Sequence, residues 1–351
     1  MKVWILIFVC MFSMPLLVAV LHFKMRKGQI LKIKQDYVKN ARYFGRSFSA
    51  LVEKALPEMK NGMIMLSRQE KVLETDGKQE FVQPEIEDLV IARNTIFCPQ
   101  QEDLHFQKEI YSEKDALFVK ENIRLRAVYS KKRIVFGNKI RLLRWADAEY
   151  AVAVYDECDL GERVSSGEQL VIGFENIFHS LYAPVIRLGQ RPEEPDRFME
   201  ERDPRIFRMP VMNRYEYNRH YIDDDMVTES GTVPYTIISR GDIKVIEDII
   251  LQGDIHSDGA VRIMENASVL GNIFAENDIL LEKNATVLGN IFTQGNIIFE
   301  EDASAGQPDK IISVVARGTI TFYGGNNIYG YVVSEGGGKI LKSDREVLGE
   351  Y

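Results

Sequence analysis

Residues 237–308 decide the fold, because they form four consecutive segments of equal length that share one pattern. The segments read IISRGDIKVIEDIILQGD, IHSDGAVRIMENASVLGN, IFAENDILLEKNATVLGN and IFTQGNIIFEEDASAGQP, and they start at Ile237, Ile255, Ile273 and Ile291. Each segment divides into three units of six residues, and the first and third residues of every unit are apolar or small. None of these positions is charged, although 27% of the chain is Asp, Glu, Lys or Arg. The pattern therefore marks one buried face.

The spacing of the buried positions favours strands over a helix. The period of the segments also equals about five α-helical turns, but residues i and i+2 share a side only in a strand. The β-branched residues and Gly-Asn corners agree with strands. Three short strands separated by turns form a triangular coil, and successive coils stack about 4.8 Å apart. The sequence thus predicts an all-β fold, a single-stranded β-helix with about 18 residues per coil.

Turn residues recur at fixed positions of the coil. Glycine, asparagine and aspartate tolerate a positive φ, so we expect the chain to turn where they align. Two such columns are Gly253, Gly271 and Gly289, and Asn266, Asn284 and Asp302.

The coils are predicted to continue beyond residue 308, so that the regular β-helix covers residues 236–335. The segment GTITF at residues 318–322 resembles GNIIF at residues 295–299, at a spacing that exceeds the regular period by five positions. We attribute the difference to a loop at residues 306–310. A last coil rich in aromatic residues follows, and residues 336–351, which begin with three glycines, are predicted to form a Gly-rich tail.

Residues 81–189 show a looser form of the same rhythm. The segment IRLRA at residues 123–127 resembles IRLLR at 140–144, and KRIVF at 132–136 resembles QLVI at 169–172. Alternating apolar and polar residues indicate strands. We interpret this region as a degenerate β-helix, with a separate β domain as the alternative.

Residues 190–235 interrupt the strand pattern. They contain five of the eleven prolines and the mixed charged run RPEEPDRFMEERDPRIFR. Proline ends regular hydrogen-bonded ladders, so we predict a long Pro-rich, charged insert between the two β regions.

Residues 3–21, VWILIFVCMFSMPLLVAVL, are almost wholly apolar and uncharged. At about 1.5 Å per residue they can span a hydrocarbon core of about 30 Å. A cleaved signal peptide has a basic start and small residues at the cleavage site, whereas only Lys2 precedes this run and HFKMRK follows it. We predict a transmembrane helix. The basic residues after it predict a single-pass protein of the cell membrane whose C-terminal bulk is cytoplasmic.

Residues 22–60 form a basic juxtamembrane and helical segment. Apolar residues recur every three or four positions within residues 35–59, among them Phe44, Phe48 and Val52. This spacing predicts an amphipathic helix. Its polar face mixes both charges, which favours packing against protein over lying on a membrane.

The sequence offers few groups for chemistry. The net charge of −8 provides no basic surface for nucleic acid. Cys10, Cys98 and Cys158 lack the spacing of a disulfide framework or a zinc site. The five histidines form no metal or catalytic motif, and no phosphate-binding loop occurs. We therefore expect no enzymatic activity, cofactor or metal.

Outward apolar residues and coil ends predict self-assembly. Exposed apolar columns are unfavourable unless something covers them, and the middle region, the insert or a second copy are the candidate covers. A terminal coil also leaves unpaired backbone groups that recruit another strand. The candidate assembly surface comprises Leu270, Phe274, Leu280, Leu288, Phe292, Ile298, Phe322, Tyr323, Tyr329 and Tyr331.

The repeats, with Gly-Asn or Gly-Asp corners before isoleucine and Asn-Ala or Asp-Ala turns, resemble those of the bactofilin family of bacterial polymer-forming cytoskeletal proteins. The resemblance covers residues 231–335. It implies a right-handed β-helix, polymerisation without nucleotide, membrane association and scaffolding of envelope or morphogenetic proteins as clients, and it supplies no catalytic residues. The spanning helix, the middle region and the insert depart from the small members of the family.

Two other classes share parts of this pattern. Acyltransferases with a left-handed β-helix use a coil of the same length, but they need a histidine base, and the regular region contains only His256, which we place on the surface. An extracellular carbohydrate-binding β-helix is the second alternative, and it requires the opposite membrane topology.

Overall fold

The computed structural model describes residues 14, 40–99, 103–192, 219–221 and 232–342. The chain divides into two units, Met1–Tyr43 and Phe44–Tyr351. Apart from Met14, the predicted transmembrane residues 3–21 lie outside the described part. Within the described part, no helix is both long and apolar enough to cross a membrane.

The described part contains a short helical region followed by strands. The helical region consists of α3 (Tyr43–Ala55) and the 3-10 helix η1 (Leu56–Glu58). The first thirteen strands are β1 (Met63–Met65), β2 (Gln69–Phe81), β3 (Glu85–Ile86), β4 (Leu89–Pro99), β5 (Leu104–Ser112), β6 (Ala116–Phe118), β7 (Ile123–Ser130), β8 (Arg133–Phe136), β9 (Arg141–Ala148), β10 (Ala151–Val154), β11 (Arg163–Ser166), β12 (Gln169–Ile172) and β13 (Asn176–Leu188).

The remaining strands are shorter on average. They are β14 (Arg219–Tyr221), β15 (Thr232–Val233), β16 (Thr236–Ser239), β17 (Ile243–Val245), β18 (Ile250–Leu251), β19 (Ile255–Ser257), β20 (Val261–Ile263), β21 (Ser268–Val269), β22 (Ile273–Ala275), β23 (Ile279–Leu281), β24 (Thr286–Val287), β25 (Ile291–Thr293), β26 (Ile297–Phe299), β27 (Ser304–Ala305), β28 (Ile312–Ala316), β29 (Ile320–Phe322) and β30 (Asn326–Ile340).

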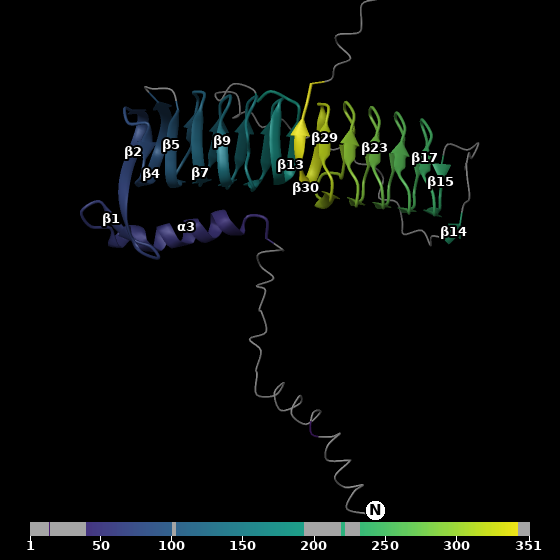
Figure 1. Ribbon diagram of the computed structural model, residues 1–351, viewed down its shortest axis with the longest axis horizontal. Coiled ribbons are helices and arrows are strands. Elements are labelled where there is room, and N and C mark those ends of the chain that lie inside the picture. The colour runs from purple at the N-terminus through teal and green to yellow at the C-terminus, as the bar shows by residue number, and fades with distance from the viewer. Residues whose placement is uncertain (1–13, 15–39, 100–102, 193–218, 222–231, 343–351) are drawn as a thin grey trace, which may run out of the picture. The chain divides into compact units, whose positions relative to one another are not determined.

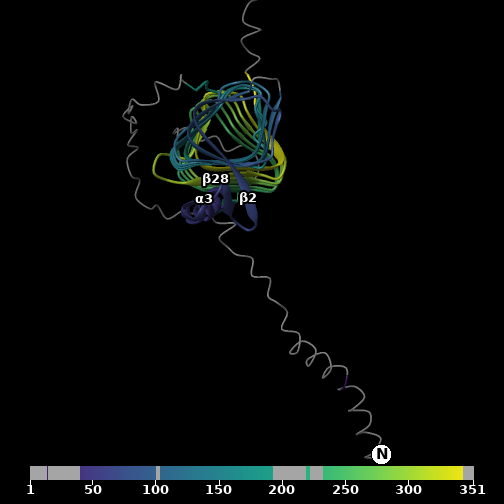
Figure 2. The ribbon, with the colours of Figure 1, turned by 90° about the vertical axis from the view of Figure 1, so that its left-hand side faces the viewer.

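Strands β14–β30 form a C-terminal half-solenoid of stacked coils with strict register. Ile237 pairs with Ile255, and Ile255 pairs with Ile273, so that equivalent residues of the repeat lie side by side. All these pairings between coils are parallel. Viewed along the axis, the coils outline a triangle (Figure 2). The predicted all-β coil is confirmed, with turns about 18 residues apart.

Strands β2–β13 form an N-terminal half-solenoid with the same period. Val128 pairs with Ala146, and Ala146 pairs with Val164, so each step again advances by one whole coil. β8 and β12 lie two coils apart on one face, with β10 between them. The degenerate β-helix predicted for residues 81–189 is therefore confirmed, and its first strand already starts at Gln69. The two halves together make about 13 turns.

The core of each half runs along its axis. In residues 237–305, the first and third residues of every unit are buried, except Ser239, which is half-buried. The N-terminal half holds a column of phenylalanines instead. Phe97 stacks on Phe118 with ring centroids 4.4 Å apart, and Phe81 stacks on Phe97 at 5.9 Å. Phe81 is 5% exposed and closes this end of the core.

The chain turns at these two columns of corner residues for different reasons. Asn266 and Asn284 have φ of 58°, as predicted for their column. The glycine column does not have positive φ, which corrects that part of the prediction. Instead, a Cβ on Gly271 would overlap the carbonyl oxygen of Gly253 in the coil before. Glycine is required here because the coils stack too closely for a side chain.

The loop at residues 306–310 falls where the spacing placed it. Gln307 and Lys310 form a short bridge, and Ile297 pairs with Ile320 across the longer interval that the sequence predicted. The glycines at residues 336–338 are not a tail, because they lie inside β30. Gly338 pairs on one side with β29 and on the other with β13. A Cβ on Gly338 would overlap the ring of Phe178.

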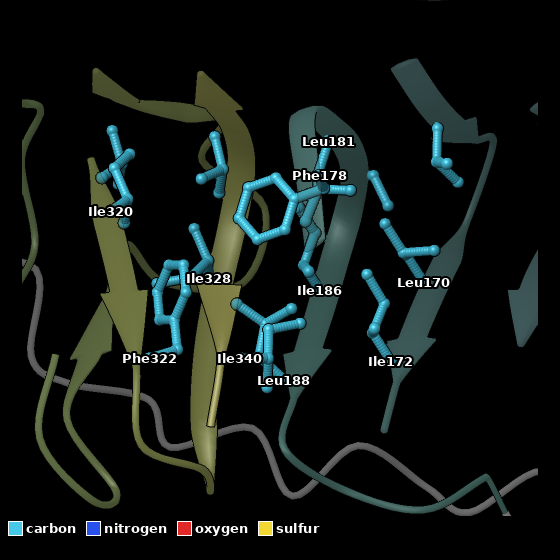
Figure 3. Close-up of a cluster of buried hydrophobic side chains, with 14 of the residues drawn as sticks. Leu170, Ile172, Phe178, Leu181, Ile186, Leu188, Ile320, Phe322, Ile328 and Ile340 are labelled. Atoms are coloured by element: carbon cyan, nitrogen blue, oxygen red, sulfur yellow. The ribbon is translucent and has the colours of Figure 1, made fainter. Parts of the chain in front are cut away.

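The two half-solenoids meet at their last coils. β13 and β30 pair antiparallel, with Leu181 opposite Val332 and Leu188 opposite Asn326. In Figure 1 the teal β13 therefore lies directly beside the yellow β30, and the chain advances toward this joint from both sides. The core is continuous through the joint, where the side chains of Phe178 and Phe322 lie 6.3 Å apart between ring centroids (Figure 3).

α3 covers the outside of the N-terminal half-solenoid and lies along its axis (Figures 1 and 2). Val52 is fully buried in a cluster with Tyr111, Tyr129 and Trp145. The helix predicted within residues 35–59 is thus a packing helix in its described part, which starts at Tyr43.

The predicted insert at residues 190–235 contains two short strands, β14 and β15. β14 pairs with β16, and β15 pairs with β18, so both belong to the C-terminal half-solenoid. Residues 193–218 and 222–231 lie outside the described part.

Candidate functional site

The predicted assembly residues of the regular coils lie on three faces instead of one patch. All are half-buried except Phe274, which is 37% exposed. By face they are Phe274 and Phe292 on β22 and β25, Leu280 and Ile298 on β23 and β26, and Leu270 and Leu288 directly after β21 and β24.

One of these faces carries a stack of rings. His256, Phe274 and Phe292 occupy one outward position in successive coils. The ring centroids are 4.8 Å apart for His256 and Phe274 and 5.4 Å apart for Phe274 and Phe292, and the rings are nearly parallel. Aliphatic residues extend the stack in both directions. This outward column, here called the ridge, consists of Ile238, His256, Phe274, Phe292, Val315 and Val333.

His256 is exposed, as predicted. It differs from a histidine set into a cleft, because its ring lies flat against Phe274 on a strand face. The other two faces are less continuous. On the β23 face, Arg262 of the preceding coil pairs with Leu280, and it forms an ion pair with Glu282.

Among the predicted assembly residues of the last coil, Tyr331 lies at the joint. Tyr331 pairs with Tyr182 of β13, with ring centroids 4.5 Å apart. Tyr323 and Tyr329 are half-buried. Phe322 is fully buried, so its assignment to the assembly surface is wrong. It is the third residue of the unit that starts at Ile320, and third residues point inward; its ring stacks on Phe299 at 4.8 Å.

The face of the ridge continues across the joint onto the N-terminal half-solenoid. Val333 pairs with Ser180, and Tyr331 pairs with Tyr182. Beyond the joint this face is covered by α3, whose Phe48 ring lies 5.7 Å from Trp145 and 6.4 Å from Tyr111. The same sheet face is thus covered by α3 in the N-terminal half-solenoid, whereas its ridge in the C-terminal half-solenoid has exposed rings.

A cleft of about 500 Å³ opens beside α3. Its lining residues are Glu53, Tyr129, Lys131, Glu149, Tyr150 and Glu168. Lys131 Nζ lies 2.8 Å from Glu53 Oε1. This hydrogen bond lowers the pKa of Glu53 and raises the pKa of Lys131. Burial raises the pKa of Tyr129 to about 12. Lys131 therefore stays protonated at neutral pH and holds α3 by an ion pair, which suits attachment better than general base chemistry.

The amphipathic spacing of residues 44–52 was sufficient to find α3, but not the surface it covers. Tyr111, Tyr129 and Trp145 lie in successive coils, so about one whole coil of sequence separates each from the next. Their alignment appears only once the coil register is known.

Comparisons with protein families, with characterised proteins and with solved structures found no match to this chain.

Metal-binding groups are sparse where the structure is described. No group of three or more His, Cys, Asp or Glu side chains in that part is arranged to hold a metal ion. Cys98 and Cys158 are free and buried, and burial raises the pKa of the Cys158 thiol to about 12. A thiol with that pKa is protonated and unreactive at neutral pH.

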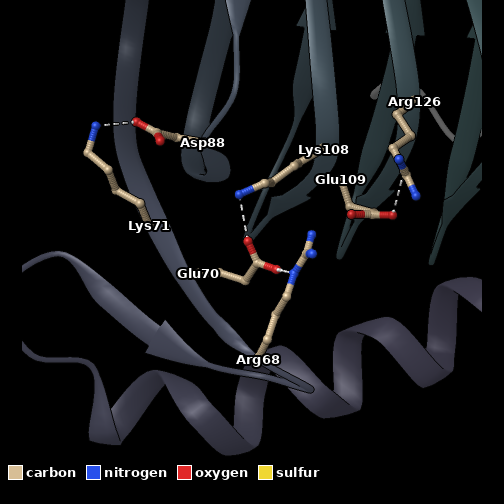
Figure 4. Close-up of polar contacts among 7 residues, drawn as sticks. All are labelled: Arg68, Glu70, Lys71, Asp88, Lys108, Glu109 and Arg126. Atoms are coloured by element: carbon tan, nitrogen blue, oxygen red, sulfur yellow. Dashed lines mark hydrogen bonds and ion pairs between the residues drawn. The ribbon is translucent and has the colours of Figure 1, made fainter.

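Ion pairs bind the first coils of the N-terminal half-solenoid to one another (Figure 4). Lys108 of β5 lies 2.6 Å from Glu70 of β2, and Lys71 of β2 lies 2.8 Å from Asp88. In the described part, residues 73–81 of β2 pair with β4 alone, so the other edge of β2 ends the sheet there. Exposed charges mark this edge and oppose strand addition, and the ladder from β2 to β4 has a register shift between Thr75 and Gly77.

Proposed function

We propose that this chain is a membrane-anchored, cytoplasmic β-solenoid scaffold that self-assembles, with a role like that of bactofilins. One observation carries the proposal. A single column of about 13 turns, roughly 60 Å long at about 4.8 Å per coil, presents an outward ridge of five apolar residues and one histidine, in register over six coils. A long rigid column with a repeating surface suits the arrangement of other proteins along a line.

The joint narrows the ways in which the column can assemble. The end of the last coil, a surface on which a β-helical filament would grow, is occupied by β13 of the same chain. The free edge of β2 carries exposed charges. In the proposal, assembly therefore uses the outer faces and the first coil of the C-terminal half more than the last coil.

The anchor is proposed from the sequence. Residues 3–21 hold the chain to the membrane, and the basic residues that follow keep the column in the cytoplasm. The clients would be envelope or morphogenetic proteins that bind along the column.

Two measurements test this function. The full chain should fractionate with membranes, and a C-terminal tag should be protected from protease in intact cells. The chain lacking residues 1–34 should sediment as species larger than a monomer without added nucleotide at tens of micromolar. A monomer at every concentration, or a tag that is accessible from outside, would contradict the scaffold.

A further inference from the structure

The ridge is flanked by a column of exposed polar residues that follows the same coils. Each member directly follows the inward residue that ends a ridge strand, so it points to the same side as the ridge. All six side chains are exposed. In order from the first coil to the sixth, this corner column consists of Arg240, Asp258, Glu276, Gln294, Arg317 and Glu335.

The order of charges in the corner column is self-complementary when read in reverse. Position one is Arg240 and position six is Glu335; position two is Asp258 and position five is Arg317. Reversal therefore sets a cation opposite an anion at four of the five charged positions. The two middle positions bring a carboxylate opposite an amide, which avoids two like charges.

Two copies can meet in this way only in one geometry. The two-fold axis runs parallel to the strands and passes between the third and fourth coils. It makes the two solenoids antiparallel. The ridge of one copy then faces the ridge of the other, and the corner column faces the corner column. Under this operation Phe274 faces Phe292 of the second copy, and His256 faces Val315. The two-fold contact is isologous and closes as a dimer.

We propose that the ridge and the corner column form a homodimer face, in which two columns pack antiparallel about this axis. The proposal rests on the self-assembly in the proposed function and names the surface and the register. Continuity with the α3-covered face supports it, because the same sheet already binds an apolar partner in the other half.

The small area of the proposed dimer face indicates a weak dimer. Six coils span about 24 Å, and a three-residue strand about 10 Å, which gives roughly 240 Å² per copy. Stable interfaces bury about 800 Å² per partner. The contact is therefore weak in dilute solution and forms where copies are concentrated, as they are on a membrane.

Cysteine pairs trap such a contact and report its register. In the full chain with Cys10→Ser, the variant Asp258→Cys with Arg317→Cys should form a disulfide-linked dimer on mild oxidation. These positions are three coils apart, about 14 Å within one chain, which is too far for an internal disulfide. Each single substitution should give no dimer. The pair Arg240→Cys with Glu276→Cys, from the same column but out of register, should also give none.

A charge exchange tests the same contact without covalent trapping. Arg317→Asp should weaken self-association about tenfold, because the pair occurs twice in each dimer. Adding Asp258→Arg should restore it. Lys244→Asp, on another face, should have no effect.

The outcomes separate this inference from the scaffold proposal. Self-association without the in-register crosslink, or with equal crosslinking of the control pair, would overturn the antiparallel face and leave the scaffold standing. A chain that remains monomeric in every assay would overturn both. Restoration by the charge exchange would establish the register.

Discussion

Tyr182 and Tyr331 face each other across the joint, with ring centroids 4.5 Å apart, although they come from the last coils of two half-solenoids that run in opposite directions. Because these two residues are neighbours on the same side of the sheet, one sheet face runs through both half-solenoids. The outward column that leads through Tyr129 and Ser165 to Tyr182 continues into Tyr331 of the other half. The joint therefore makes one surface from two repeats.

The joint predicts an internal disulfide. Tyr182→Cys combined with Tyr331→Cys should oxidise within one chain, because the residues are direct antiparallel partners. Non-reducing electrophoresis should show a monomer of increased mobility. Tyr182→Cys with Ser313→Cys, one strand farther away, should not react internally. A disulfide between chains would mean that the joint forms between copies.

Close packing at the joint predicts that Gly338→Ala is destabilising. Its Cβ would overlap the Phe178 ring, and overpacking typically costs about 1–3 kcal/mol. Thermal unfolding followed by circular dichroism measures the loss. Gly241→Ala is the control, because no atom lies within 4 Å of a Cβ there. Equal stability of the two variants would show that the joint is looser than described.

Because β23 alternates between the core and the outer face, charged substitutions at two neighbouring residues should have very different effects on stability. Ile279→Asp places a carboxylate in a fully buried position and should cost several kcal/mol or prevent folding. Leu280→Asp, at the adjacent outward and half-buried position, should be tolerated at a smaller cost. Chemical denaturation compares them. Similar losses would mean that the inward and outward assignment of this strand is wrong.

The ion pairs at the first coils predict that the free energy of unfolding depends on pH. The hydrogen bond from Lys108, with that from Arg68, lowers the pKa of Glu70 below its ordinary value of 4.5. A lowered folded pKa means that this stabilisation is present above about pH 4.5 and is lost as the pH falls through the folded value. Glu70→Gln should therefore lose on the order of 1 kcal/mol at pH 7 and approach the parent as the pH falls through the folded pKa of Glu70.

Denaturation from pH 7 to pH 3 measures this difference. Glu74→Gln, exposed on the same strand, is the matched control and should change little. A constant gap between Glu70→Gln and the parent at all pH values would show that charge does not hold β2.

Local periodicity was sufficient to predict the coils. The i, i+2 pattern of residues 237–305 specified which side chains enter the core, because each strand alternates and each coil repeats. The same reasoning placed the loop at residues 306–310, since an insertion shifts the period without changing the pattern. The weaker pattern of the N-terminal half predicted strands but left the alternative of a separate domain.

The joint had no local signature. It pairs Phe178 with Gly338, residues of two strands that are far apart in the sequence. The glycines at residues 336–338 resembled a tail because their function is to leave room for a ring on another segment. Phe322 faces the core for a related reason: it is the third residue of its unit, and the aromatic composition of the last coil does not distinguish inward from outward positions.

The most direct test of the scaffold is electron microscopy of the full chain reconstituted in lipid vesicles at high density, without nucleotide. The account predicts rods, each about 60 Å long from the stacking distance of the coils, that lie at the membrane and associate side by side in antiparallel pairs or larger ordered arrays. Rods that stay separate and randomly placed at the highest density would contradict it.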